Sequence, residues 1–257
     1  MEDLWVLVVL GIVQGITEWL PVSSSTHIGL VSSWLGIVPT LSVEVALHLG
    51  TLMAVFVYFG NDIVSGVRDL LLGEFRTDFA RLLLFVGLAS IPAGLLGYAF
   101  HDMISGYTGS FAFAGGGLLI TSLLLFLGSK APHRSRPLTA RGALLIGCVQ
   151  ALSLLRGISR SGSTLVPGLW LGLREREAIR FSFLLSIPVI IGASLVSIGN
   201  QPLSSSLFLG TLVSFGVGIG GIHFFFTRVL CDRQNLRWFA VYTGLLGIGI
   251  LVWQLFA

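Results

Sequence analysis

Long apolar segments, separated by short polar stretches, follow one another along the whole chain. A helix needs about 20 apolar residues to cross a hydrocarbon layer about 30 Å thick, and six segments approach or exceed that length. We therefore predict six transmembrane helices, near residues 43–59, 80–99, 110–128, 178–198, 205–226 and 237–256.

Two further apolar segments are interrupted by polar and helix-breaking residues. Residues 3–36 are broken at 21–26, and residues 141–173 are broken at 156–164. Neither half of either segment is long enough to cross the bilayer and leave it. Irregular backbone at membrane depth is tolerated where it is buried in protein or lines a cavity. We therefore predict two re-entrant helix-loop-helix hairpins, each entering and leaving the membrane on one side.

The composition agrees with a membrane protein. Hydrophobic residues make up 54% of the 257 residues, charged residues only 11%, and the mean hydropathy is +0.92, which excludes a water-soluble globule. The net charge of +3 does not indicate nucleic-acid binding, because the basic residues lie in short loops between predicted spans. Cys148 and Cys231 are far apart and lack metal-ligand spacing, so neither a disulfide framework nor a metal site is expected from them.

The distribution of basic residues predicts the topology, because cytoplasmic loops carry an excess of Lys and Arg. Six spans and two re-entrant hairpins place four basic loops on one side, whereas the opposite loops, 100–109 and 199–204, contain neither Lys nor Arg. Both termini then face outward, the first hairpin enters from outside, and the second enters from the cytoplasm. The four loops contain Arg68, Arg76 and Arg81; Lys130, Arg134, Arg136 and Arg141; Arg174, Arg176 and Arg180; and Arg228, Arg233 and Arg237.

This topology is that of an inverted-topology repeat. The sequence supports one, since five residues of the first hairpin recur in the second at a constant spacing. We therefore predict a single all-α membrane domain over residues 1–257, with approximate repeats 1–128 and 141–257 and a basic cytoplasmic linker at 129–140. The recurring residues are Gly11, Val13, Gln14, Ser23 and Ser25, matched by Gly147, Val149, Gln150, Ser159 and Ser161.

The break of the first hairpin carries candidate chemistry. Gln14 and Glu18 are four residues apart, so they share one helix face just before Pro21 ends the helix. Hydroxyl groups and an imidazole follow. Carboxylate and amide oxygens favour a divalent cation such as Mg²⁺ or Ca²⁺ on Glu18 and Gln14. The side chains that follow the proline are Ser23, Ser24, Ser25, Thr26 and His27.

The break of the second hairpin adds cations and further hydroxyls. Charges at membrane depth are costly and normally face the bundle interior or water, so Arg156 and Arg160 are expected to meet the first break near the middle of the membrane. Arginine and backbone N–H groups at helix ends are suited to phosphate. The predicted phosphate-binding residues are Arg156, Ser159, Ser161 and Thr164 here, with Ser23, Ser25 and Thr26 from the first break.

Structural interpretations stay open for several of these residues. Glu18 alone is compatible with hydrogen bonding between helices, and His27 with a structural role. Glu44 and His48, four apart at the outer end of the first predicted span, fit a lining of the site or an anchor at the interface equally well. The glycine-rich runs 115–117 and 216–221 are interpreted as close helix packing.

The two breaks, taken together, resemble the undecaprenyl-diphosphatase (bacitracin-resistance protein) family. The resemblance rests on Gln-x-x-x-Glu at 14–18, Leu-Pro-Val-Ser-Ser at 20–24 with His27, and Gly-x-Ser-Arg-Ser-Gly-Ser-Thr at 157–164; it extends to 46–59 and 181–188. It implies a membrane hydrolase that removes one phosphate from undecaprenyl diphosphate, regenerating the lipid carrier for peptidoglycan and other envelope polymers. It also implies a divalent cation, and action at the outer face of the bacterial inner membrane.

The resemblance also implies roles for individual residues. Glu18, Ser24, His27 and Arg160 become the catalytic candidates, with Arg160 as the phosphate clamp. Our hypothesis is that Ser24 is the nucleophile and His27 its base; a phosphorylated His27 and a metal-activated water remain alternatives. Gln14 and Glu18 fill the cation-binding motif, while Ser23, Ser24, Ser159, Ser161 and Thr164 fill the hydroxyl positions.

Two positions depart from the family pattern. The family usually has proline where this chain has Arg156, and glutamate where it has Arg180. A divergent paralogue acting on another polyprenyl diphosphate is therefore an alternative, as is a flippase or transporter for a polyprenyl phosphate, because transporters are also built from inverted repeats with broken helices. The sequence leaves open the lipid chain length, the metal and a homodimer.

Overall fold

The protein is entirely helical over the residues that the computed structural model describes, which are 4–100, 103, 106, 110–198, 205–229 and 232–256. The two loops that contain neither Lys nor Arg, 100–109 and 199–204, lie largely outside this set, and Cys231 lies wholly outside it. Cys148 is a free, exposed thiol. The α-helices are α1 (Leu4–Thr17), α2 (Ser24–Trp34), α3 (Leu41–Tyr58), α4 (Gly60–Leu71), α5 (Asp78–Ala99), α7 (Phe111–Ser129), α8 (Ala140–Gln150), α9 (Arg160–Leu171), α10 (Glu175–Ile198), α11 (Ser205–Phe224) and α12 (Leu236–Phe256).

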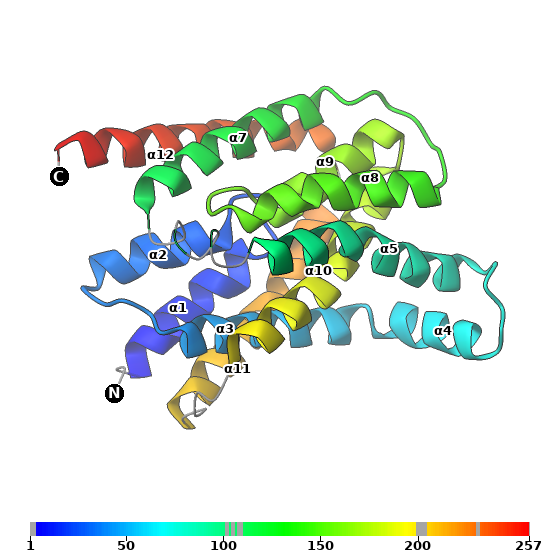
Figure 1. Cartoon of the computed structure of the whole chain (residues 1–257), viewed down its shortest axis with the longest axis horizontal. Helices are drawn as coiled ribbons and strands as arrows, with labels where there is room; N and C mark the ends of the chain where they lie inside the picture. The colour runs from blue at the N-terminus through cyan, green and yellow to red at the C-terminus, as the bar shows by residue number, and fades with distance from the viewer. Residues whose placement is uncertain are drawn as a thin grey trace.

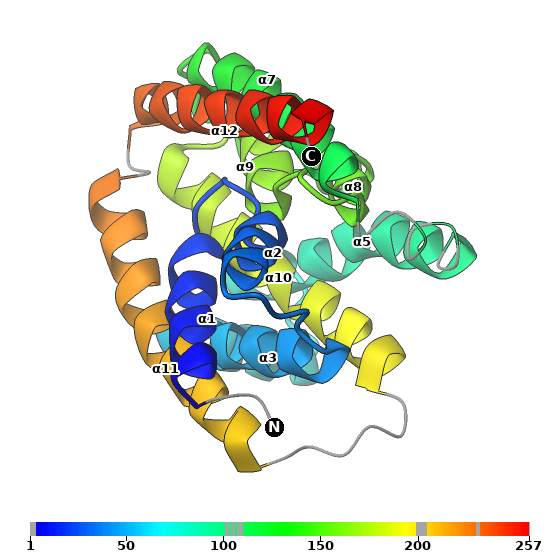
Figure 2. The same cartoon turned by 90° about the vertical axis from the view of Figure 1, so that its left-hand side faces the viewer.

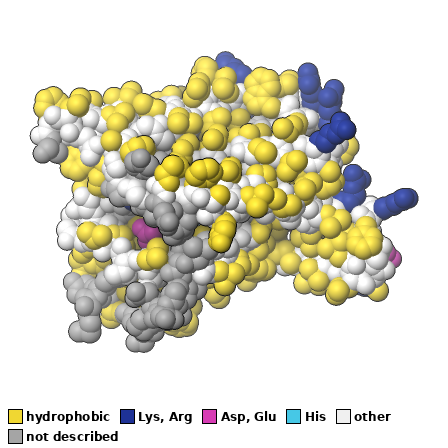
Figure 3. Space-filling model, viewed as in Figure 1, with side chains coloured by type: hydrophobic (Ala, Val, Ile, Leu, Met, Phe, Trp, Pro, Cys, Tyr) yellow, Lys and Arg dark blue, Asp and Glu magenta, His cyan; other side chains and the backbone are white. Residues whose placement is uncertain are grey.

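Within the described ranges, six helical segments are long and apolar enough to cross a membrane, and each overlaps one of the six predicted spans. The prediction of six spans is confirmed in this sense, and the protein is a multi-pass membrane protein. Hydrophobic side chains cover most of the face in Figure 3, whereas Lys and Arg gather at the end where α8 begins. The segments are Leu41–Tyr58, Asp78–Ala99, Phe111–Ser129, Glu175–Leu195, Leu207–Val229 and Arg233–Phe256.

Each interrupted apolar segment forms a pair of short helices. The first pair is α1 and α2, and the second is α8, a short 3₁₀ turn at Ala151–Leu154, and α9. In Figure 1 the outer ends of α1 and α2 lie at one end of the molecule, and those of α8 and α9 lie toward the opposite end. The two breaks, at residues 18–23 and 155–159, face each other in the middle. We call each break, together with the first residues of the helix that follows it, a tip: the first tip leads into α2 and the second tip leads into α9.

Helices of each half pack on helices of the other half in matching pairs. α1 packs on α11 as α8 packs on α5, and α3 packs on α11 as α10 packs on α5; α7 and α12 pack on each other, as Figure 2 also shows. Gly11 of α1 lies against the Gly210 backbone of α11, and Gly147 of α8 lies against the Ala89 backbone of α5. Small residues allow this approach of helix backbones, which drives helix packing in lipid.

Helix α4 was not predicted, because its polar residues interrupt the apolar pattern. Helix α4 supplies the partner of Arg180, one of the two positions where the chain departs from the family pattern. The Arg180 guanidinium donates to Asp62 of α4 at 2.6 Å and lies 5.3 Å from the ring centre of Phe79 on α5. The charge at position 180 is therefore neutralised by a partner on α4. This ion pair joins α10 to the α4–α5 pair.

Candidate active site

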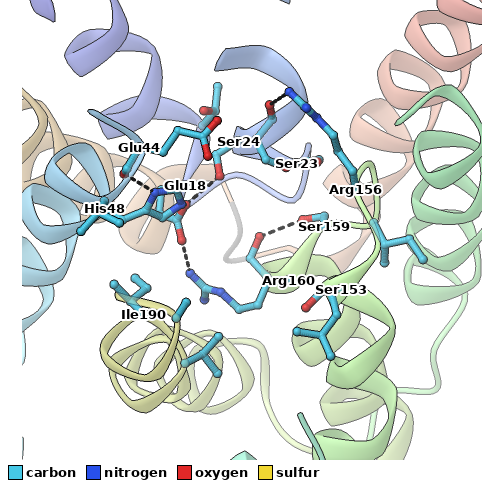
Figure 4. Close-up of a pocket in the computed structure, with 18 of the residues that line it drawn as sticks. Glu18, Ser23, Ser24, Glu44, His48, Ser153, Arg156, Ser159, Arg160 and Ile190 are labelled. Carbon is cyan, nitrogen blue, oxygen red and sulfur yellow. Dashed lines mark hydrogen bonds and ion pairs between the residues drawn. The ribbon is translucent and has the colours of Figure 1, made fainter. Parts of the chain in front are cut away.

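A cavity of about 440 Å³ lies between the two tips, and polar groups from both tips line it. Figure 4 shows Glu18 and Ser24 on one side, with Ser159 and Arg160 opposite. Apolar side chains of α3 and α10 form another part of the wall. The lining residues are Thr17, Glu18, Leu20, Ser23, Ser24, Ser25, Leu41, Glu44, Val45, His48, Ser153, Leu154, Arg156, Ile158, Ser159, Arg160, Ser161, Val189, Ile190, Ala193 and Ser194.

Glu18 is the centre of the polar contacts in this cavity, although its side chain is only 6% exposed. Its Oε1 accepts a hydrogen bond from the Arg160 guanidinium. Its Oε2 accepts from Ser24 Oγ at 2.7 Å and from Gln14 Nε2 at 3.1 Å. A buried carboxylate requires such partners, because burial of an uncompensated charge is costly. The carboxylate thereby joins one residue from each tip.

The first tip presents the beginning of α2 to the cavity. Ser23 adopts a positive φ of 68°, which is uncommon for a residue with a Cβ and marks local strain. The first turn of α2 has no side-chain cap, so its backbone N–H groups are not taken up by a capping residue. A helix beginning of this kind attracts phosphate. Thr26 Oγ1 lies 3.1 Å from Ser23 Oγ.

The second tip places Arg160 at the beginning of α9. Ser159 caps this helix, because its Oγ accepts from the Gly162 N–H at 3.2 Å. The Arg160 guanidinium also donates to the Ser182 carbonyl of α10 at 3.2 Å, which restricts its movement. Ser161 Oγ donates to the Leu20 carbonyl at 3.0 Å and so ties the second tip directly to the first.

Four predicted site residues do not line the cavity. Gln14 contacts it through Glu18. Thr26 is buried behind Ser23, and Thr164 bonds Ser182 Oγ at 2.5 Å, joining α9 to α10. These three residues therefore support the cavity wall from behind. The fourth is His27.

His27 is not hydrogen-bonded to Ser24. Its Nδ1 lies 2.8 Å from the Ser23 carbonyl and its Nε2 lies 2.7 Å from the Tyr242 hydroxyl of α12. A carbonyl only accepts, so Nδ1 donates, and in the neutral imidazole Nε2 therefore accepts from Tyr242. Ser24 donates to Glu18 instead. Glu18 thus occupies the position that our hypothesis gave to the His27 base.

Glu44 and His48 line the cavity from α3, which answers the question that the sequence left open. His48 Nδ1 donates to the Glu44 carbonyl at 2.8 Å, and its Nε2 lies 3.7 Å from Glu18 Oε2. The four-residue spacing was the sequence signal for both. Sequence reasoning missed Ser153 and Ser194, because isolated serines within apolar stretches carry no distinctive pattern.

Arg156 lies at the rim of the cavity, against α2. Its guanidinium donates to the Ser25 carbonyl at 3.0 Å and occupies the space where a side chain at Gly29 would lie. Arg156 therefore depends on the absence of a Cβ at position 29. This contact connects the second tip to α2, and it keeps a second cation beside the cavity.

The donors near Glu18 suit a hard divalent cation. Gln14 Oε1 is buried without a hydrogen-bond partner, and Glu18, Glu44 and Ser24 add further oxygens. Among the described residues, no group of three or more His, Cys, Asp or Glu side chains forms a metal site. Mg²⁺ commonly binds to one or two carboxylates and completes its ligands with substrate phosphates, which is compatible with this donor set.

The fold and the cavity define a class of protein: a multi-pass membrane protein that carries a buried arginine, a carboxylate and hydroxyl groups in a cavity between two helix breaks. The family model of the bacitracin resistance protein BacA matches residues 7–249, and the chain belongs to this family.

Among similar proteins, the undecaprenyl-diphosphatase of Korarchaeum cryptofilum is 37% identical over 255 residues, covering 95% of this chain and 96% of that protein. That of Trichlorobacter lovleyi is 37% identical over 269 residues, covering 97% and 96%. Undecaprenyl-diphosphatase 1 of Bacillus licheniformis is 36% identical over 264 residues, covering 95% and 96%. The likeness therefore includes both tips.

Proposed function

We propose that this protein is an undecaprenyl-diphosphatase, which hydrolyses undecaprenyl diphosphate to undecaprenyl phosphate and inorganic phosphate. The observation that carries the proposal is the meeting of Glu18, Ser24 and Arg160, from two separate tips, in one cavity. The family and the similar proteins named above support the same reaction. Lipid transport alone would require the arginine but not a hydroxyl bonded to a buried carboxylate.

In the proposed mechanism, Ser24 Oγ attacks the terminal phosphorus. The new bond joins Oγ to phosphorus while the bond from phosphorus to the bridging oxygen breaks, and undecaprenyl phosphate leaves. Glu18 Oε2, already 2.7 Å from Ser24 Oγ, takes the hydroxyl proton and passes it to the leaving phosphate. Arg160 stabilises charge on the phosphoryl oxygens, because its guanidinium has more N–H donors than its two contacts use.

Water then completes the reaction. Glu18 takes a proton from water as the water oxygen attacks the phosphoserine, and it returns the proton to Ser24 as inorganic phosphate departs. A bound cation, held by Glu18 and Gln14 with the substrate phosphates, would supply further neutralisation of charge. Direct attack by water without a phosphoserine is the alternative route, and it requires no hydroxyl at position 24.

We also propose that α1–α2 and α8–α9 are re-entrant hairpins of an inverted-topology repeat. The exchanged contacts between the halves and the opposite directions of the two helix pairs support this arrangement. The cluster of Lys and Arg at the end where α8 begins supports placing that end in the cytoplasm. The first tip is then reached from the outer face, where the lipid diphosphate would bind.

Removing divalent cations from the purified protein should reduce phosphate release at least tenfold. A divalent cation neutralises charge on the phosphates, and the side chains of the cavity do not replace that charge when the cation is removed. The measurement is phosphate release from undecaprenyl diphosphate in detergent, with and without EDTA, followed by addition of Mg²⁺ or Ca²⁺. Full activity in EDTA would contradict the proposed requirement for a divalent cation. Absence of release by folded protein with cations present would contradict the proposed function itself.

Gly29→Ala should raise the KM for the lipid diphosphate about tenfold, because a methyl group there displaces the Arg156 guanidinium from the rim. Arg156→Gln should have the same effect, and the double variant should be no worse than either. Gly94→Ala on α5 is the matched control, since a Cβ there meets open space. Additive losses in the double variant would show that Gly29 does not act through Arg156.

A further inference from the structure

The second tip lies directly on α7, which contributes no side chain to the cavity. The contact is made by Thr121, whose side chain is buried at 1% exposure. Its Oγ1 donates to the Gly157 carbonyl at 2.9 Å and accepts from the Ser159 N–H at 2.9 Å. A hydroxyl has one donor and two acceptor sites, so one Thr121 hydroxyl satisfies two buried backbone groups of the same loop.

The two groups that Thr121 holds lie just before Arg160. Ser159 is the cap of α9 and Arg160 is its first residue. The position of the loop therefore determines the position of the Arg160 backbone, from which the guanidinium extends. Gly157 adopts a φ of 92°, which favours glycine and turns the chain toward α9. Without the hydroxyl, both backbone groups would be buried without partners, and the loop would move to find others.

Gly117 of α7 provides the second part of this platform. A Cβ there would lie 2.8 Å from the Gly157 Cα and still closer to the Arg156 carbonyl. The helix backbone therefore supports the loop sterically while Thr121 supports it by hydrogen bonds. The glycine run at 115–117 had suggested only helix packing. Gly115 does pack on Gly247 of α12, whereas Gly117 faces the second tip.

We propose that Thr121, with Gly117 beneath the loop, is a positioning residue for Arg160 and determines where its guanidinium meets the phosphate and Glu18. This inference rests on the proposed function for its kinetic consequence. The first tip depends on the same support, since Ser161 follows Arg160 and donates to the Leu20 carbonyl. The Thr121 hydroxyl, which lies outside the cavity, thus determines how the second tip is positioned against the first.

The test uses two matched pairs of variants in the full-length protein. Thr121→Val removes the hydroxyl at nearly constant volume, and its control, Ser122→Ala, removes a neighbouring hydroxyl that bonds the Ala240 carbonyl of α12 at 2.7 Å. Gly117→Ala pushes on the loop, and its control is Gly116→Ala, where a Cβ meets open space. Thr121→Ser restores the hydroxyl and serves as the rescue variant.

The first readout is amide hydrogen exchange, which does not depend on activity. Exchange over the second tip should become faster in Thr121→Val and Gly117→Ala, but not in Thr121→Ser or either control. Unchanged exchange at the tip in both Thr121→Val and Gly117→Ala would overturn the inference, even if the wild-type protein released no phosphate. This readout therefore separates failure of the inference from failure of the proposed function.

The second readout is phosphate release from undecaprenyl diphosphate. The kcat should fall at least tenfold in Thr121→Val and in Gly117→Ala, since small displacements of a positioned group cost large factors in rate. Thr121→Ser and both controls should stay within about twofold of wild type. Equal losses in Thr121→Ser and Thr121→Val, or equal losses in Ser122→Ala, would reduce Thr121 to a general packing role and overturn the inference.

Discussion

Arg160→Ala should lower kcat/KM for undecaprenyl diphosphate by about 10³-fold or more, the scale on which an arginine stabilises phosphoryl transfer. Arg160 is the cation of the second tip that contacts Glu18 and lines the cavity. Its loss removes the group that neutralises charge on the phosphoryl oxygens. Arg160→Lys should recover only part of the loss, because an ammonium cannot reproduce the planar, forked donors of a guanidinium.

The control must separate lost chemistry from lost stability. Arg160→Ala leaves Glu18 as a buried charge without its ion-pair partner, which typically destabilises by about 3–5 kcal/mol. The double variant Glu18→Gln, Arg160→Met carries neither charge and should unfold at a higher temperature than Arg160→Ala, yet remain inactive. Arg233→Lys is the matched control for Arg160→Lys, because Arg233 is also a buried arginine in an ion pair, with Glu175, but lies outside the cavity. Near-normal activity in folded Arg160→Ala would refute the clamp.

The sequence predicted the architecture where a single physical requirement dominates. Length and hydropathy alone locate the six long helices, because the bilayer imposes both. The two breaks were found from the runs of polar and helix-breaking residues at 21–26 and 156–164, because such runs are costly in an apolar helix that faces lipid. Both breaks had to face protein or water, and the predicted topology brought them into the membrane from opposite sides. The sequence therefore also predicted that the two breaks meet. Glu18, Ser24 and Arg160 do line one cavity.

The sequence did not predict which individual side chains of distant segments contact one another. His27 lies close to Ser24 in the chain, yet its ring bonds Tyr242, more than two hundred residues away in the sequence. His48 faces Glu18 from another helix. Thr121 looked like any threonine in an apolar span, since its partners lie in the second tip. Such roles depend on which helix faces pack together, and the spacing of residues along one segment does not determine that.

Ser24→Ala should reduce kcat by about 10³-fold or more, because the nucleophile of a two-step phosphoryl transfer has no substitute in the same position. Ser24 Oγ is the hydroxyl that donates to Glu18 in the cavity. Neighbouring hydroxyls bond one another instead, as Ser23 does with Thr26. Glu18 keeps its contacts with Arg160 and Gln14 in the variant, so the fold should be retained. The measurement is phosphate release at saturating substrate, which gives kcat, together with single-turnover release with the protein in excess over the substrate.

A matched control and a chemical readout identify the step that is lost. Ser33→Ala, an exposed serine on the same helix, should release phosphate at the wild-type rate. Substrate labelled in its terminal phosphate should leave an acid-stable phosphoserine on wild-type protein but not on Ser24→Ala. A parallel alkaline quench preserves phosphohistidine, which acid would hydrolyse. If Ser24→Ala retains most of the turnover, water attacks directly and Ser24 only binds the phosphate. If the label instead appears on His27, its Nε2 must leave the Tyr242 hydroxyl during the reaction, and the assignment of Glu18 as the base of Ser24 fails with it.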